Sequence, residues 1–293
     1  MKNKLSLFAV PYVGWMSIFV VAPIIIMVVY AFSTAAGDFT LENFARMGTY
    51  TAVFTRSFKL AIIATLIALL IGYPVSYMLS KEGPQVQRIA MVLIMLPMWM
   101  NFLLRTYSWM SILENNGLLN QLFQQIGLID HYNQIAMHFA SDPAAYVPID
   151  HFQMIGTQGA VVLGMVYNYL PFMILPIYSV LVKLDHSLIE AARDLGASSV
   201  QVFRKVILPL SLPGVLSGIT MVFVPSVSTF AISKMLGGGT EMMLGDLIEQ
   251  QFLGGAYNPQ LGAAISLVMM LIVVVCMVVM NRFGEGEEQA VML

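Results

Sequence analysis

Charged side chains are scarce in this 293-residue sequence, where Asp, Glu, Lys and Arg make up 10% of the residues and hydrophobic residues make up 58%. Soluble globular domains carry roughly 25% charged residues. A chain so poor in charge cannot cover a water-exposed surface of its own size, which excludes an ordinary cytosolic enzyme. We therefore expect most of its surface to face lipid or other protein.

Cysteine is almost absent, and an excess of basic residues is missing. The one cysteine, Cys276, lies within an apolar run, which excludes an internal disulfide and a cluster of thiolate metal ligands. The 14 Lys and Arg residues are scattered and are outnumbered by 16 Asp and Glu residues. The chain thus lacks the basic surface that nucleic acids require, and we expect no nucleic-acid partner.

The sequence also lacks a recognisable catalytic or metal-binding constellation. His131, His138 and His151 share one segment, but their spacings match no compact ligand pattern. No Ser/His/Asp or Cys/His set can be assigned to a shared pocket. We therefore predict no metal site, no cofactor in this chain and no enzymatic activity.

Long uncharged segments are what the sequence does contain. A helix needs about 20 apolar residues to cross the hydrocarbon core of a bilayer. We predict an all-α polytopic membrane protein, a single domain over residues 1–293, with six transmembrane spans at about 5–32, 60–80, 89–113, 154–182, 206–233 and 261–281. Prolines inside these segments predict kinks. Arg105, which interrupts the third segment, is expected to reach toward the membrane interface.

The distribution of Lys and Arg predicts the orientation. If the N-terminus is cytoplasmic, nine of these residues fall in inner segments and four in outer segments. This bias follows the positive-inside rule. With six spans, both termini are then expected in the cytoplasm.

The outer segment 114–153 contains an amphipathic pattern. Leu118, Leu122 and Ile126 fall on one helical face, and Asn120 and Gln124 fall on the opposite face. Two interpretations remain open. The helix lies flat at the membrane surface, or it docks an extracytoplasmic partner.

The cytoplasmic loop 183–205 carries the most specific signal. Ser187 and Glu190 have capping-box spacing at the start of a short helix, and Gly196 stands where a left-handed stop is expected. Ser198 and Gln201 have the same spacing before a second helix, which leads into the fifth span. We predict a short helix rigidly continued into the membrane.

Glu190-Ala191-Ala192, then Gly196, then Leu208-Pro209 resemble the EAA loop of bacterial ATP-binding-cassette importer permeases. Val206 replaces the isoleucine usual in that family. The resemblance implies a MetI-like permease fold, in which this loop is a coupling helix that docks on an ATPase subunit. The coupling residues that it implies here are Glu190, Ala191, Ala192, Asp194, Gly196 and Pro209.

Residues 99–107, 170–173, 190–196 and 245–252 are similar to spermidine/putrescine importer permeases. The resemblance implies a polyamine importer in the bacterial cytoplasmic membrane. Its other parts would be a second homologous permease, two ATPase subunits that bind ATP and Mg, and an extracytoplasmic polyamine-binding protein. At the position of Lys234 in this chain, those permeases commonly have an acidic residue.

A path for a polycation should offer aromatic faces, hydroxyls and a few carboxylates, since a cation over an aromatic ring gains about 0.5 to 2 kcal/mol. Such side chains can instead belong to an interfacial belt or to helix packing. The candidates are Trp99, Tyr107, Trp109, Glu114, Tyr167, Tyr169, Ser228 and Phe230.

Three other functions compete with polyamine import. The first is a permease of the same class for another small solute, which would share the EAA-like loop. The second is a stand-alone secondary transporter or channel, but the six spans contain no doubled, internally repeated halves. The third is a membrane scaffold without transport. The docking loop argues against the last two, because neither needs one.

Overall fold

The computed structural model describes residues 11–139 and 146–291, and within these ranges the secondary structure is helical apart from one isolated antiparallel bridge between Ser33 and Phe39. The predicted all-α class is confirmed. The described residues contain five helices long and apolar enough to cross a membrane, at Pro11–Ala31, Glu42–Ser80, Gln158–Leu181, Ser199–Ser228 and Pro259–Met280. Two further helices, joined at a sharp bend, bring the number to six if they form one span.

In the first half of the chain, the described residues form a π-helical turn, two 3-10 turns and seven labelled helices of very different length. They are η1 (Ser17–Val21), α2 (Ala22–Ala31), α3 (Glu42–Met47), η2 (Gly48–Tyr50), α4 (Thr51–Ser80), α5 (Pro84–Met95), η3 (Leu96–Trp99), α6 (Phe102–Leu113), α7 (Leu118–Gln125) and α8 (Leu128–Phe139).

The second half alternates long helices with short ones. They are α9 (Gln158–Leu181), α10 (His186–Asp194), α11 (Ser199–Val202), the π-helical turn η5 (Phe203–Ile207), α12 (Leu208–Ser228), α13 (Ala231–Leu236), α14 (Leu244–Leu253) and α15 (Pro259–Val291).

The centre of the molecule is formed by α4, α9 and α12, which pack against one another, and α15 covers α12 and contacts α2. Small residues let these backbones approach closely. A Cβ atom at Gly214 would lie only 2.8 Å from the carbonyl oxygen of Pro176, and one at Gly218 would lie 3.1 Å from that of Met173. The Ser76 hydroxyl on α4 also reaches the carbonyl oxygen of Ile174 on α9, at 3.0 Å.

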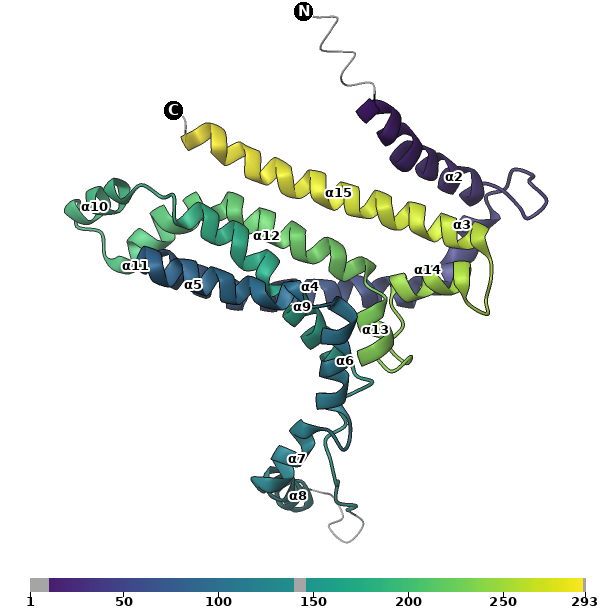
Figure 1. Ribbon diagram of the computed structural model, residues 1–293, viewed down its shortest axis with the longest axis horizontal. Coiled ribbons are helices and arrows are strands. Elements are labelled where there is room, and N and C mark those ends of the chain that lie inside the picture. Colours follow the sequence, from purple (N-terminus) through teal and green to yellow (C-terminus); the bar gives the residue numbers. More distant parts are fainter. Residues whose placement is uncertain (1–10, 140–145, 292–293) are drawn as a thin grey trace, which may run out of the picture.

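The long helices run in broadly the same direction, so the bundle has two ends (Figure 1). Short helices α10 and α11 lie at one end, and α3 and α14 lie at the other. We call these the α10 end and the α14 end.

The second span begins earlier than the uncharged segment 60–80. Helix α4 starts at Thr51 and includes Arg56 and Lys59. The sequence pattern stopped at these charges, but a helix tolerates a charge that finds a partner. Arg56 has one, because its Nε atom lies 3.3 Å from a carboxylate oxygen of Glu241.

The predicted third span, 89–113, is broken in the structure. The segments Pro84–Trp99 and Phe102–Gln125 meet at an angle of 89°. Asn101 sits at the break, and its side-chain oxygen accepts hydrogen bonds from the backbone N–H groups of Leu103 at 2.9 Å and Leu104 at 3.3 Å. An asparagine that caps a new helix in this way competes with continuation of the old one.

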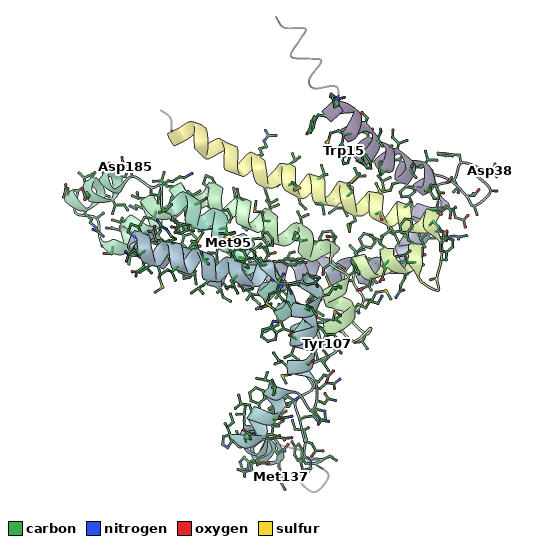
Figure 2. All side chains as sticks on the ribbon, in the orientation of Figure 1. Trp15, Asp38, Met95, Tyr107, Met137 and Asp185 are labelled. Atoms are coloured by element: carbon green, nitrogen blue, oxygen red, sulfur yellow. The ribbon has the colours of Figure 1, made fainter. Side chains whose placement is uncertain are left out.

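Beyond the break, α6, α7 and α8 form an arm that projects from the side of the bundle (Figure 1). Figure 2 shows Tyr107 on this arm and Met137 near its far end. The predicted amphipathic helix is present as α7, but Asn120, expected on its polar face, is 1% exposed. It is buried because its side chain bonds the backbone N–H and carbonyl of Phe152 at 2.9 and 3.0 Å.

Candidate coupling surface and substrate path

Helix α10 is capped at both ends, but its N-terminal cap is not the predicted one. The side chain of Asp185 accepts a hydrogen bond from the N–H of Ser187 at 2.9 Å. The predicted Ser187–Glu190 capping box is therefore wrong, because the helix already begins at His186 and Ser187 lies inside it. The predicted C-terminal stop is confirmed: Gly196 has a φ of 82°, in the left-handed region.

The apolar residues of α10 divide between two faces. Ile189 and Ala192 pack on the apolar cluster that contains Val202 and Ile207. Leu195, by contrast, is 89% exposed. Four of the six predicted coupling residues, Glu190, Ala191, Asp194 and Gly196, are also exposed, while Ala192 and Pro209 are half-buried. The inner face thus fixes α10 to the bundle and the outer face is open to a partner.

A rigid connection joins α10 to α12. The predicted Ser198–Gln201 capping box is confirmed, with the Ser198 N–H donating to the Gln201 side chain at 2.8 Å. The ring of Phe203 in η5 then packs edge-on against Tyr73 and Tyr77 of α4, with centroids 5.9 and 5.5 Å apart. A displacement of α10 therefore acts directly on the start of α12.

The π-helical turn η5 ends at Ile207, two residues before Pro209, which is the second residue of α12. A proline has no N–H to donate and its ring displaces the carbonyl of the preceding turn. A π-helical turn is one way in which a helix absorbs such a defect, and it often marks a functional position. The connection between α10 and α12 thus contains one helical irregularity, next to the start of the span.

The structure brings some of the predicted path residues together. Trp109 on α6 and Tyr167 on α9 meet edge-on, with ring centroids 5.3 Å apart. Tyr169 lies beside Thr229, the residue between the exposed Ser228 and the half-exposed Phe230 where α12 ends. Trp109 and Tyr169 pack against the same apolar cluster, so these contacts place the candidates around the junction of α6, α9 and the α12–α13 break.

The other three candidates are not brought into that region. Trp99 is 76% exposed at the bend, Tyr107 is 55% exposed on the arm, and Glu114 is exposed where α6 ends. Within the described chain, no hydrogen bond or ring contact joins their side chains to Trp109 or Tyr167. They are available to lipid or to a partner.

Arg105 does not reach toward the interface, which corrects the expectation from the sequence. It is only 8% exposed, and its Nε and Nη1 atoms are buried without a hydrogen-bond partner among the described residues. The bend at Asn101 is the reason, because it sets the start of the arm, helix α6, against α9 and α13.

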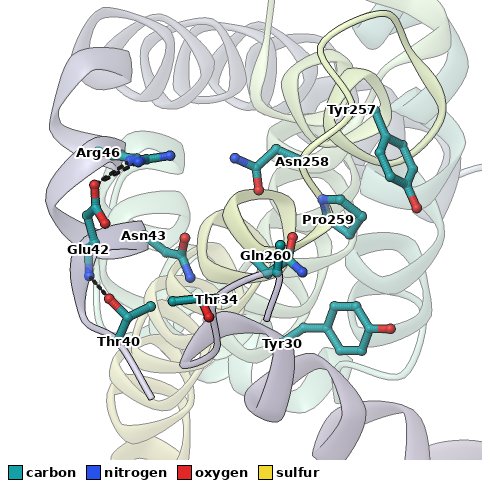
Figure 3. A pocket seen from close by; sticks show the side chains of 11 residues that line it. Tyr30, Thr34, Thr40, Glu42, Asn43, Arg46, Tyr257, Asn258, Pro259 and Gln260 are labelled. Carbon is teal, nitrogen blue, oxygen red and sulfur yellow. Dashed lines mark hydrogen bonds and ion pairs between the residues drawn. The ribbon is translucent and has the colours of Figure 1, made fainter. Parts of the chain in front are cut away.

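Two polar cavities lie at the α14 end. The larger, about 550 Å³, is bounded by α2, α3 and the start of α15 (Figure 3). Its charged groups, Glu42 and Arg46, already pair at 2.7 Å. The smaller, about 140 Å³, lies between α13 and α14 and is lined by Lys234, Glu241, Asp246 and Glu249.

The acidic residues of the smaller cavity were not among the predicted site residues. Arg56 and Glu241 pair although they are 185 residues apart in the sequence, and no local sequence pattern predicts such a pair. One local signal was present: Met243 and Asp246 have the spacing of an N-terminal helix cap, and the Met243 N–H does donate to Asp246 at 2.8 Å.

A helical membrane body with a capped, exposed helix that continues into a span is the architecture of a permease subunit. The chain belongs to the family described as binding-protein-dependent transport system inner membrane component, which residues 68–286 match. It is therefore an inner-membrane transport subunit and not an enzyme in its own right.

Relatives of known function match nearly the whole chain. The chain is 35% identical over 271 residues to the spermidine/putrescine transport system permease protein PotB of Escherichia coli K12, covering 90% of this chain and 91% of that protein. It is 34% identical over 293 residues to PotB of Haemophilus influenzae, covering 97% and 96%.

Solved structures share the fold. The crystal structure of a bacterial ABC transporter involved in the import of the acidic polysaccharide alginate contains a chain that matches with a TM-score of 0.72 and 17% identity, covering 97% of this chain and 96% of that one. A chain of the MetNI methionine ABC transporter matches with a TM-score of 0.52 and 19% identity, covering 84% and 98%. The predicted permease fold is confirmed.

Proposed function

We propose that this permease carries polyamines, spermidine or putrescine, into the cell as one subunit of an ATP-driven importer. The observation that supports this most strongly is the identity to PotB, which extends over 90% or more of the chain. The proposed complex contains a second, homologous permease, two ATPase subunits and an extracytoplasmic polyamine-binding protein. ATP and Mg belong to the ATPase subunits.

The proposed coupling element is α10. In this mechanism its exposed face, with Glu190 and Leu195, docks on an ATPase subunit. Closure of the ATPases around ATP moves α10, and the capped α11 and η5 pass that movement to α12. Because α12 packs on α4 and α9, its displacement changes the packing of the whole bundle. The path then opens to one side of the membrane at a time.

The proposed path runs past the junction of α6, α9 and the α12–α13 break. Trp109, Tyr167 and Tyr169 offer aromatic faces there, and Ser228 offers a hydroxyl. Cations gain free energy over aromatic faces without being held as tightly as by a fixed carboxylate pair. This suits a polyamine, which must be released on the far side.

The proposed orientation places the α10 end in the cytoplasm, because the ATPases that it would dock are cytoplasmic. The α14 end then faces outward, toward the binding protein. The positive-inside bias of the sequence supports the same orientation.

Uptake in living cells tests the substrate. Cells without their own polyamine uptake are supplied with this permease and its co-encoded partners, and accumulation of labelled spermidine and putrescine is measured. We expect accumulation that disappears when the binding protein is omitted. Uptake of another small solute without either polyamine would retain the permease class and overturn the polyamine assignment, and Lys234 would then be the first residue to examine.

A further inference from the structure

We propose that the cavity between α13 and α14 binds a primary ammonium group, and that the side chain of Lys234 is a tethered occupant which the incoming ammonium displaces. The identity of the incoming molecule as a polyamine rests on the proposed function. The site itself rests on the geometry of four side chains.

The cavity contains more carboxylates than there are cations paired with them. Three carboxylates line it, those of Glu241, Asp246 and Glu249, and two cations pair with them, Arg56 and Lys234. Glu241 already has partners, because Arg56 lies 3.3 Å from its Oε2 atom and the Gln158 amide donates to the same atom at 3.2 Å. One carboxylate therefore has no cation of its own.

That carboxylate is Asp246, which is only 6% exposed. Its Oδ2 atom accepts from the Met243 N–H at 2.8 Å, whereas its Oδ1 atom is buried with no hydrogen-bond partner in the part of the chain that the structure describes. Ser233 is close, but its hydroxyl donates its one proton to the carbonyl oxygen of Phe230 at 3.0 Å. A buried acceptor without a donor costs about 1 to 3 kcal/mol. That oxygen atom, at the edge of the cavity, thus lacks a hydrogen-bond donor among the described residues.

The contacts of Lys234 indicate which kind of ligand the cavity can bind. Its Nζ atom lies 3.0 Å from each carboxylate oxygen of Glu249. Its side chain is nevertheless 62% exposed, so it can leave the cavity and become fully hydrated without a large desolvation cost. A free primary ammonium has the same three donors, and the carboxylates of Glu249 and Asp246 line the same cavity.

The size of the cavity sets a limit on the occupant. Its volume of about 140 Å³ equals that of a few water molecules at about 30 Å³ each. One ammonium with a short methylene stem fits, and a whole polyamine does not. The site therefore takes one end of a polyamine, and the remainder lies outside it.

The model of a displaceable lysine is tested on the purified, assembled importer without its binding protein. Propylammonium chloride is titrated calorimetrically into the wild type and into Lys234→Met. Removal of the tethered competitor should lower the dissociation constant about two- to fivefold, the range expected from an exposed ion pair. Lys59→Met is the matched control, because Lys59 is also an exposed lysine and lines a different cavity. It should leave the constant unchanged.

Removing the carboxylates should have the opposite effect. Asp246→Asn and the less buried Glu249→Gln, each in the Lys234→Met background, should weaken propylammonium binding. Equal binding by wild type, Lys234→Met and Lys59→Met would overturn the proposal, and so would Lys234→Met and Lys59→Met strengthening binding to the same extent.

The same preparation separates this proposal from the proposed function. ATP hydrolysis is measured with the binding protein and spermidine. Stimulated hydrolysis with no effect of Lys234→Met on propylammonium binding would retain the polyamine importer and reject the site. Propylammonium binding that responds to Lys234→Met, with no stimulation by either polyamine, would retain the site and reject polyamine import.

Discussion

Leu195 carries the clearest prediction at the scale of single residues. It is 89% exposed at the end of α10, so its replacement cannot open a cavity in the bundle. An apolar side chain in that position gains free energy only when a partner covers it. We expect Leu195→Asp to lower co-purification of the ATPase about tenfold or more, with the permease level in the membrane unchanged.

The control for this experiment is Leu253→Asp, the same substitution at the α14 end, where Leu253 is 83% exposed. It should leave ATPase co-purification at the wild-type level. Normal co-purification of Leu195→Asp would show that α10 docks through other residues or does not dock at all.

Asp246 predicts a dependence of stability on pH. Burial raises the pKa of its carboxyl above 3.8, against a smaller lowering effect of the hydrogen bond from the Met243 N–H. The folded state therefore binds this proton more tightly than the unfolded chain, and the resulting stabilisation, complete below 3.8, is lost as the pH rises through the raised pKa. The Asp246→Asn variant has no carboxyl at this position, so it does not lose this stabilisation as the pH rises.

The measurement is the thermal unfolding midpoint of the purified importer from about pH 4 to 7. As the pH rises, the midpoint of Asp246→Asn should increase relative to that of the wild type. Asp38→Asn, at an exposed loop carboxylate, should follow the wild type across the series. A constant difference between Asp246→Asn and the wild type would contradict the expectation.

At the scale of elements, the contact of α12 with α9 depends on Gly214. A Cβ atom there would lie 2.8 Å from the backbone oxygen of Pro176 and 3.1 Å from the Cα atom of Ile177, and backbone atoms cannot move aside as a flexible side chain can. Gly214→Ala should lower the thermal unfolding midpoint by about 3 to 8 °C. Gly83→Ala, where a Cβ atom meets nothing within 4 Å, should change it by no more than about 1 °C. An unaltered midpoint in Gly214→Ala would show that the helices separate easily.

Elements whose signals are local could be predicted from the sequence. Gly196 and the Ser198–Gln201 pair mark a helix end and a helix start by their own backbone preferences, and both are found. The choice of Ser187 over Asp185 failed because both can cap a helix and they stand only two residues apart. The break at Asn101 was not predicted, because a single polar residue in a long apolar segment does not by itself indicate the end of a helix. Only the hydrogen bonds of its side chain to the next helix reveal the cap.

The sites could be predicted less well than the fold. Aromatic residues such as Trp109 and Tyr167 can be selected by type, but only the packing of α6 on α9 shows that these two meet. Arg105 was expected at the interface because the bend that buries it was not foreseen. The pairs of Arg56 with Glu241 and Lys234 with Glu249 arise from tertiary structure alone.

At the scale of the whole molecule, the orientation in the membrane can be measured directly. Single cysteines at Ala36, in the exposed loop at the α14 end, and at Ser199, at the α10 end, are introduced into a Cys276→Ala chain. In intact cells an impermeant thiol reagent should label the cysteine at 36 and spare the one at 199. Opening the cells should make the second cysteine reactive. Labelling at 199 alone in intact cells would reverse the orientation.

The central claim is that this chain couples ATP hydrolysis to polyamine import, and one measurement addresses both parts. The importer is reconstituted in proteoliposomes with ATP inside and its binding protein outside, and hydrolysis and the accumulation of labelled spermidine are followed in the same sample. Our account predicts that both rise together when spermidine is added to the wild type, and that neither rises in Leu195→Asp. The account would be contradicted if neither ATP hydrolysis nor accumulation changed with spermidine or putrescine, while ATP hydrolysis rose with a solute that has no amino groups and that solute accumulated.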